Sequence, residues 1–225
     1  MRALANVLAL ACLLALTLLA GCWWSLATEP GGRWLARQAR AWVPGFSLAR
    51  VEGVVLGRFA VQGLDYRGAT ERLHLDRLQY RLAVDDFWRG RLHFHHIDLH
   101  GPRYASSDSS PIAWPSLRLP FALAIDALSL RDGTVQPASA SAPIPLSALD
   151  AALELTRDGL DIRQLDVTLP DLGLALDGHL TLGGLAGIAL RTRWYWHPAG
   201  RPAFRGEGQL GGHPGRVLVH QRLQA

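Results

Sequence analysis

From Phe46 onward, apolar and polar residues alternate along the chain, and this period of two restricts the segment to β-strands. The clearest example is LGLALDGHLTL, residues 172–182, where one face carries only leucines and one glycine. Residues 188–196, IALRTRWYW, begin the same pattern with Ile188 and Leu190. Gly, Pro, Asp and Ser separate these segments, so we expect about ten strands joined by short turns in a largely antiparallel sheet.

A sheet with one leucine-rich face has to cover that face. Long helical patterns are nearly absent after Phe46, so the sheet has to fold on itself. A closed barrel or a sandwich would bury the apolar face completely. A long, curved trough would instead keep the apolar face open for a ligand. The periodicity alone leaves these alternatives open.

The amino terminus carries a different signal, an uncharged apolar run from Ala3 to Gly21. As a helix it would be about 28 Å long, close to the hydrocarbon thickness of about 30 Å. We therefore expect residues 1–27 to form a transmembrane segment or signal anchor. The run ends in LAGC at residues 19–22, which is typical of the site where a bacterial lipoprotein is cleaved and acylated. A retained anchor and a lipoprotein acylated at Cys22 are both open.

Residues 28–45 form a linker that contains a short amphipathic helix, RWLARQARAWV, at residues 33–43. One face carries the arginines Arg33, Arg37 and Arg40. The opposite face carries Leu35, Ala39 and Trp42. Such a helix can lie on a membrane surface with its arginines toward lipid phosphates. It can also cap the end of a β-sheet core, and the two arrangements are compatible.

Composition and charge argue against several classes of function. The net charge is +4, and all 23 basic Lys or Arg side chains are arginines. They are scattered singly, without the clusters and interleaved aromatic residues of nucleic-acid-binding proteins. The two cysteines, Cys12 and Cys22, both lie in or next to the apolar run, so the remaining chain has no disulfide framework and no thiol nucleophile. We expect no nucleic-acid partner.

The segment RLHFHHIDLHG, residues 91–101, is the strongest candidate for a metal site because it holds four histidines. On a regular strand, His93 and His95 point to one face, whereas His96 and His100 point to the other. His-x-His is a genuine zinc-ligand spacing, but a site also needs a third ligand and a second shell. The sequence identifies neither, and we expect no metal.

Other catalytic patterns are weak. GEGQLGG, residues 206–212, contains G-x-G-x-x-G, but a dinucleotide fingerprint requires a helix to follow and a strand pattern follows instead. Single carboxylates such as Asp126, Asp161, Asp166 and Asp177 lie on polar strand faces without an obvious partner. The chain has no G-x-S-x-G motif. We expect no enzyme activity, no catalytic residues and no cofactor.

The order of the segments resembles a known family. The span and the helix ending in Pro44-Gly45 precede RFAVQGLDYRG (58–68), LHLDRLQYRLAV (73–84) and GRLHFHHIDLHGPRY (90–104). This order resembles the amino-terminal region of the TamB family, the inner-membrane subunit of the translocation and assembly module. The family belongs to the AsmA-like group and is related to bridge-like lipid-transfer proteins. The resemblance is weaker but consistent in FALAIDALSLRDGTVQ (121–136) and AFRGEGQLGG (203–212).

The resemblance implies a mainly β protein whose residues 46–225 form an elongated, curved β-trough with an apolar interior. Such proteins are thought to carry phospholipids toward the outer membrane and to assist protein assembly there. The candidate lipid-lining residues are Leu172, Leu174, Leu176, Leu180, Leu182, Ile188 and Leu190. Family members typically run far beyond this chain, to a domain that meets an outer-membrane barrel partner, and we therefore regard direct contact with such a partner as doubtful. The competing interpretation is a small lipoprotein with a closed barrel or sandwich.

The signals for location conflict. Arg33, Arg37 and Arg40 follow the apolar span, whereas only Arg2 precedes it, and by the positive-inside rule this would hold the body in the cytoplasm. The resemblance and the LAGC motif both imply export. We expect a single-pass inner-membrane protein with its body in the periplasm.

Overall fold

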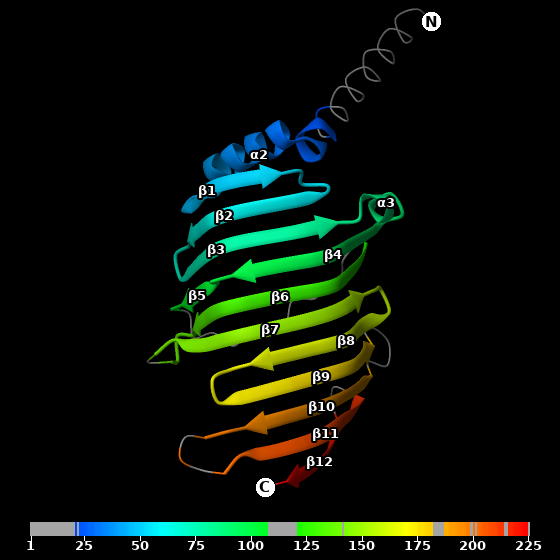
Figure 1. Ribbon diagram of the computed structural model, residues 1–225. Coiled ribbons are helices and arrows are strands. Elements are labelled where there is room, and N and C mark those ends of the chain that lie inside the picture. The colour runs from blue at the N-terminus through cyan, green and yellow to red at the C-terminus, as the bar shows by residue number, and fades with distance from the viewer. Residues whose placement is uncertain are drawn as a thin grey trace, which may run out of the picture.

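The computed structural model describes residues 21, 23–107, 121–140, 142–181, 187–198, 200, 202–213 and 216–224. Nearly all strand residues belong to one sheet that follows a helix (Figure 1). In chain order the elements are α2 (Glu29–Trp42), β1 (Phe46–Gly53), β2 (Arg58–Arg67), β3 (Glu71–Leu82), α3 (Val84–Phe87), β4 (Arg91–His100), β5 (Arg103–Ser106), β6 (Ala122–Gln136), β7 (Ile144–Leu155), β8 (Gly159–Thr168), β9 (Leu172–Thr181), β10 (Ile188–Trp196), β11 (Phe204–His213) and β12 (Arg216–Gln224).

The sheet has 12 strands, and its spatial order follows the chain from β1 to β12 with one exception: β5 pairs with both β3 and β6. All pairings are antiparallel except those of β6 with β4 and β5, which are parallel. This confirms the expectation of a mainly β, largely antiparallel fold. The strands are more numerous than expected, because the short β5 and the parallel return to β6 have no distinct sequence signal.

Within the described residues the sheet is open. Its order begins at β1 and ends at β12, and no pairing closes these two edges. The strands also belong to a single sheet, so there is no second sheet to form a sandwich. The closed barrel or sandwich of the competing interpretation is therefore wrong for this part of the chain.

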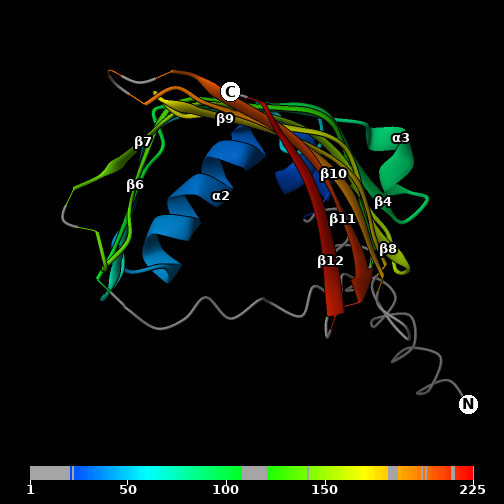
Figure 2. The same ribbon diagram turned by 90° about the horizontal axis from the view of Figure 1, so that it is seen from below.

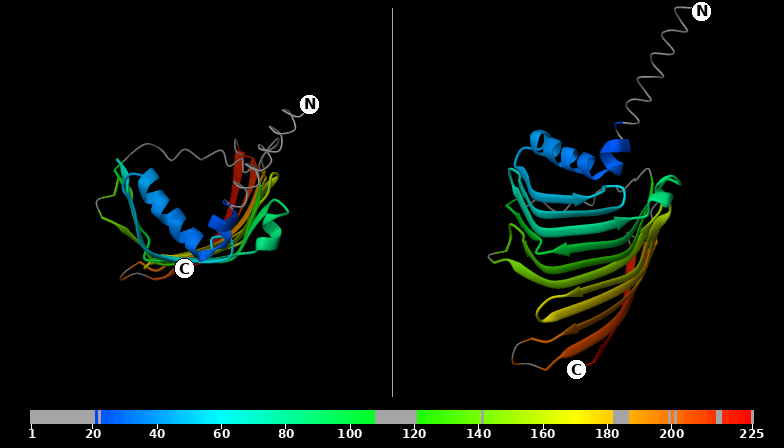
Figure 3. Two further views of the ribbon diagram at one scale, coloured as in Figure 1. Left: turned by 90° about the horizontal axis from the view of Figure 1, so that it is seen from above. Right: turned by 45° about the horizontal axis from the view of Figure 1, so that its top comes forward.

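The open sheet is strongly curved. Seen along its length it forms an arch, and α2 lies inside the arch at the β1 end (Figure 2). The view from the opposite end and the tilted view show the same arrangement (Figure 3). The buried Gly32 of α2 brings the helix against this inner face: a Cβ at Gly32 would lie 3.7 Å from Phe59 Cε2 and 3.6 Å from Val55 Cγ2. The helix thus closes one end of the concave side, as the capping interpretation predicts.

The start of α2 follows from local chemistry. Thr28 has an extended backbone, and its side-chain oxygen accepts a hydrogen bond from the Gly31 amide at 3.2 Å. This is an N-cap, and Pro30 lies in the first turn, where its missing amide costs nothing. The helix stops at Trp42, before Pro44, because proline disfavours a helical conformation in the residue that precedes it.

Alternation along the strands is interrupted along a line that crosses three of them. β4, β6 and β8 each contain two adjacent exposed residues where the register with a neighbouring strand shifts. These pairs are His95–His96, Asp126–Ala127 and Arg163–Gln164. Such a β-bulge turns two consecutive side chains to the same face and resets the alternation. The apolar residues on either side therefore stay on one face although they are three positions apart.

The bulge overturns one sequence-based prediction. His96 is opposite Arg81 in the register, whereas Ile97 is opposite Tyr80, whose ring contacts the inward-facing Phe94. His96 and His100 therefore lie on the same outer face as His93 and His95, and not on the opposite one. The prediction of opposite faces was wrong because it assumed a regular strand.

A second line of irregularities consists of residues with positive φ. Gly63, Gly101 and Asp132 have φ values of 60°, 60° and 57° and occupy one row across the sheet. A side chain at Gly63 would lie 2.8 Å from the Cβ of Ala49, so a glycine is required there. At this row the alternation of side chains between the two faces shifts again. Val61 and Leu64, which are three positions apart, can therefore share the apolar face.

The predicted membrane segment, residues 3–21, lies outside the described residues except for Gly21, and Cys22 also lies outside them. Among the helices that the structure describes, none combines the length and the apolar character needed to cross a bilayer.

Candidate functional site

The concave apolar face is the main candidate site. On β9, the leucines predicted to line it are paired across the sheet with apolar residues of β10: Leu172 with Trp196, Leu174 with Trp194, and Leu180 with Ile188. Leu176 is opposite Thr192, and Leu190 is opposite Gly178 and Leu210. The register therefore brings the predicted residues into one continuous band. Leu182 lies outside the described residues.

The side chains of this band are neither fully buried nor fully exposed. All six described candidates, Leu172, Leu174, Leu176, Leu180, Ile188 and Leu190, are half-buried. In a closed core these side chains would be almost fully buried, whereas isolated on a flat surface they would be mostly exposed. Half-burial is what neighbouring side chains on an open, curved sheet provide.

Glycines of β11 make room for the large rings of this band. Gly206 is opposite Trp194, and a Cβ there would lie 2.5 Å from two atoms of the Trp194 indole. The indole therefore lies over the glycine and fills the band at this point. Trp196 continues the surface by stacking on Phe204, with ring centroids 5.9 Å apart.

The end of the trough near α2 is rich in exposed tryptophans. Its exposed tryptophans are Trp23, Trp24, Trp34, Trp42 and Trp88. The ring of Trp88, which follows α3, contacts that of Trp23 at a centroid distance of 5.4 Å. Trp42 is 74% exposed. Tryptophan is enriched at membrane–water interfaces, where its ring is partly dehydrated.

The arginines of α2 have distinct surroundings. Arg33 and Arg37 are exposed, and Arg33 forms an ion pair with Glu29 at 2.7 Å. Arg40 instead donates a hydrogen bond to the Leu48 carbonyl of β1. Arg33 and Arg37 thus remain accessible to a surface outside the protein, whereas Arg40 also fastens the helix to the sheet.

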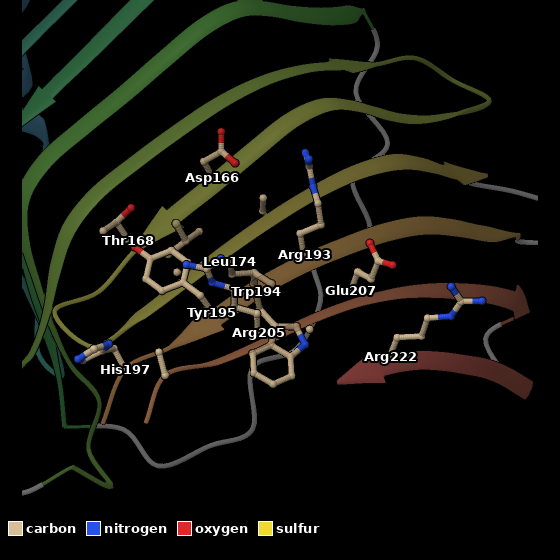
Figure 4. A pocket seen from close by; sticks show the side chains of 15 residues that line it. Asp166, Thr168, Leu174, Arg193, Trp194, Tyr195, His197, Arg205, Glu207 and Arg222 are labelled. Atoms are coloured by element: carbon tan, nitrogen blue, oxygen red, sulfur yellow. The ribbon is translucent and has the colours of Figure 1, made fainter. Parts of the chain in front are cut away.

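The outer face is polar and is covered by ion pairs between neighbouring strands, such as Arg191 with Asp177 at 2.6 Å. A depression of about 890 Å³ lies beside β10 and β11 (Figure 4). The charged groups around it are Arg193, Arg205, Arg222, Asp166 and Glu207. Leu174 and Trp194 of the apolar band also line it, so this depression combines charged side chains with part of the band.

A second polar site on the outer face includes two of the four histidines. His93 Nδ1 lies 2.7 Å from Asp86 Oδ2, and its Nε2 lies 2.8 Å from Asp126 Oδ2. His95 Nδ1 lies 3.2 Å from the same Asp126 oxygen. Arg163 donates to the other oxygen, Oδ1, also at 3.2 Å. Burial opposes ionisation of Asp126, but these hydrogen bonds outweigh it and lower its pKa to about 2.

The sequence alone does not show that Asp126 lies beside the histidines. The connection depends on the parallel pairing of β4 with β6, which places His93 beside Ala124 and Phe94 beside Ile125. One signal was available: apolar residues are spaced three apart in FHHI (94–97), IDAL (125–128) and IRQL (162–165). This spacing marks the bulges that turn His95, Asp126 and Arg163 outward.

An open, curved and largely antiparallel sheet with an apolar concave face and one end covered by a helix defines a trough-shaped β-protein. Comparison with known families identifies the first part of the chain: residues 18–111 match the family model of TamB, N-terminal domain. This match confirms the TamB resemblance seen in the sequence for residues 18–111, which are less than half of the chain. The matched region takes in α2 and β1 to β5 and stops before β6. No curated protein and no solved structure was found to match the chain.

Proposed function

We propose that the protein is anchored in the inner membrane and that its periplasmic β-trough shields phospholipid acyl chains from water. The observation that carries this proposal is the continuous, half-buried apolar band on the concave face. Each methylene group moved from water onto such a surface contributes up to about 0.8 kcal/mol. Because the band changes little in character from strand to strand, an acyl chain can slide along it. The lining residues are Leu172, Leu174, Leu176, Leu180, Leu182, Ile188 and Leu190.

The TamB domain supports this role, because the family is associated with phospholipid transport to the outer membrane and with protein assembly there. The family's corresponding partner is an outer-membrane barrel protein, but direct contact of this chain with it is not part of the proposal. We retain the division into an anchor (1–27), a helical linker (28–45) and a β-domain (46–225) as part of the proposal. No catalytic step is needed, since partition of acyl chains requires neither a nucleophile nor a cofactor.

A photo-crosslinking experiment tests the lipid path. A photoreactive amino acid is placed at Leu190, on the concave band, or at Ala189, an exposed neighbour on the outer face. After irradiation of intact membranes, mass spectrometry should find phospholipid attached at position 190, at least tenfold more than at position 189. Equal labelling at the two positions would exclude the concave face as a lipid path.

A matched pair of substitutions tests passage along the trough. Leu190→Arg places a charge on the path of an acyl chain, and an unpaired charge is costly in apolar surroundings. Ala189→Arg adds the same charge to the polar face. Transfer of a fluorescent phospholipid between vesicles should fall strongly with the first variant and stay near the wild-type rate with the second. Transfer that is insensitive to both would contradict the proposal.

The tryptophan-rich end indicates how the trough is oriented relative to the membrane. We place α2 and the loop after α3 on the membrane surface, with Trp42, Trp88 and the exposed arginines Arg33 and Arg37 toward the headgroups. In vesicles with anionic lipid, Trp42 and Trp88 fluorescence should shift to the blue. Tyr195, also exposed but at the other end, should remain accessible to a water-soluble quencher when replaced by tryptophan.

Two experiments test the location of the body and the way it is anchored. Alkaline phosphatase fused after residue 104 should be active if the body is periplasmic, whereas a reporter that is fluorescent only in the cytoplasm should be dark. Cys22→Ala separates the two anchors: unchanged mass and inner-membrane location indicate a retained span. A loss of lipid-modified mass would instead establish a lipoprotein.

A further inference from the structure

The aligned bulges of β4 and β6 create a convergent set of donor atoms on the outer face. His93 and His95 are two residues apart on β4, and their ring centroids are 4.7 Å apart. Asp126 lies beside them on β6, and the candidate donor atoms of the three residues lie within 4.8 Å of one another. These donors come from two strands that are 31 to 33 positions apart in the sequence.

We propose that His93, His95 and Asp126 form a binding site for a divalent transition-metal ion, with Zn²⁺ as the best fit. Two imidazoles and one carboxylate, completed by water, are a common zinc ligand set. Ligand atoms at about 2.0 Å from a tetrahedral ion lie about 3.3 Å from each other. Asp126 Oδ2 already lies 2.8 Å from His93 Nε2 and 3.2 Å from His95 Nδ1. Small rotations of these side chains therefore suffice to receive the ion.

The surroundings orient the ligands as a metal site requires. A histidine that binds a metal through one nitrogen usually donates its other N–H to a carboxylate or carbonyl. His93 meets this condition, because its Nδ1 lies 2.7 Å from Asp86 Oδ2 and leaves Nε2 for the ion. Ligating carboxylates are similarly held by hydrogen bonds, and Arg163 holds Asp126 through Oδ1, which leaves Oδ2 free. Asp86 and Arg163 thus act as positioning residues.

The location suggests a structural purpose. β4 and β6 are joined in parallel rather than by a hairpin, and Asp86 belongs to α3. An ion here would bind α3, β4 and β6 together, at the one place in the described sheet where consecutive long strands are not hairpin neighbours. The site lies on the outer face, away from the apolar band, so it does not depend on the proposed lipid path.

Co²⁺ titration of the full chain tests the site. The protein is purified in detergent through a tag without histidines and freed of metal with a chelator. Wild type should bind one Co²⁺ with the intense visible absorption of low-coordinate cobalt, and Zn²⁺ should displace it. His95→Ala should weaken binding at least tenfold, and this half-exposed position should tolerate alanine. Asp126→Asn should weaken it at least as much.

Two further variants separate a built site from general histidine binding. Asp86→Asn should weaken Co²⁺ binding about 10- to 100-fold, as expected for loss of a second-shell carboxylate. His96→Ala removes the adjacent exposed imidazole, which is not a ligand, and should change the affinity less than about twofold. Absence of the visible band in wild type overturns the proposal. Equal effects of His95→Ala and His96→Ala would also overturn it.

Discussion

The two ends of the sheet are packed differently. Every apolar side chain that the structure describes as buried lies in the part from β1 to β7 or in its loops: Leu48, Leu56, Val61, Leu75, Leu82, Ala124, Ile125, Ala151 and Leu155. From β8 to β12 the described apolar side chains are half-buried or exposed, and Leu223 reaches 69% exposure. The same alternating pattern therefore produces a packed core at one end and an accessible apolar surface at the other.

Helix α2 accounts for part of this difference, at the β1 end of the sheet. The helix packs on β1 and approaches Phe59 of β2, and polar anchors add to this packing: Tyr80 donates a hydrogen bond to the Val55 carbonyl at 2.9 Å, and burial raises its pKa to about 12. The later strands have no comparable helix among the described residues. The packed end therefore supplies stability that the open end cannot.

The largest expected contrast is between a buried leucine at the packed end and an exposed leucine at the open end. Leu75→Ala removes a side chain that is only 6% exposed and should lower the free energy of unfolding by about 2–5 kcal/mol. Leu223→Ala, at the open end, should change it by less than about 0.5 kcal/mol. Urea unfolding followed by circular dichroism measures both. Similar losses would mean that the two ends are equally packed in solution.

A smaller contrast is expected at two glycines with positive φ. Gly63 has a φ of 60° and no room for a Cβ, whereas Gly200, between β10 and β11, has a φ of 72° and open space around it. Gly200→Ala should cost about 1–2 kcal/mol from the left-handed backbone alone. Gly63→Ala adds a collision with Ala49 and should cost more. Thermal unfolding of the two variants measures both costs. A larger loss of stability for Gly200→Ala than for Gly63→Ala would contradict the packing difference.

The smallest effect is a pH dependence in the packed end. Hydrogen bonds to Asp65 at 2.7 Å and to Asp76 at 2.8 Å raise the pKa of His74 above its ordinary value of 6.5, although burial acts in the opposite direction. The stabilisation is therefore complete below the unfolded pKa and is lost as the pH rises through the folded one.

His74→Gln is the matched variant for this effect. Wild type should exceed it in melting temperature at about pH 5.5, and the difference should shrink by about pH 8.5. A difference in melting temperature that grows with pH would contradict this prediction, because it would show that His74 stabilises the fold in its neutral form.

The sequence was informative about strands and less so about their irregularities. Period two identified the elements and the face shared by the β9 leucines, because side-chain alternation is a local property. The bulge at His95–His96 was missed, and with it the common face of the four histidines. The spacing of Phe94 and Ile97 carried that information, but an apolar pair three apart is equally compatible with a helical turn.

Other features depended on contacts that no local pattern encodes. Asp126 joins the histidines only through the parallel pairing of β4 with β6, whose residues are 31 positions apart. The placement of α2 inside the arch likewise depends on the approach of Gly32 to Phe59. The amphipathic pattern around Arg33 and Arg37 predicted a helix, but not which side of the sheet would receive it.

The parallel junction of β4 with β6 also has a mechanical consequence. The other long strands that follow one another in the sequence pair in antiparallel fashion. A force applied at the two ends of the chain would therefore open these hairpins one at a time at low load. At the junction the paired strands run in the same direction, and their hydrogen bonds would have to be sheared together rather than opened in succession. Stretching should thus proceed in small steps from both edges and pause at this seam. The matched TamB domain, residues 18–111, ends just before β6. The end of the matched domain and the mechanically strongest seam of the sheet would therefore lie at nearly the same point in the chain.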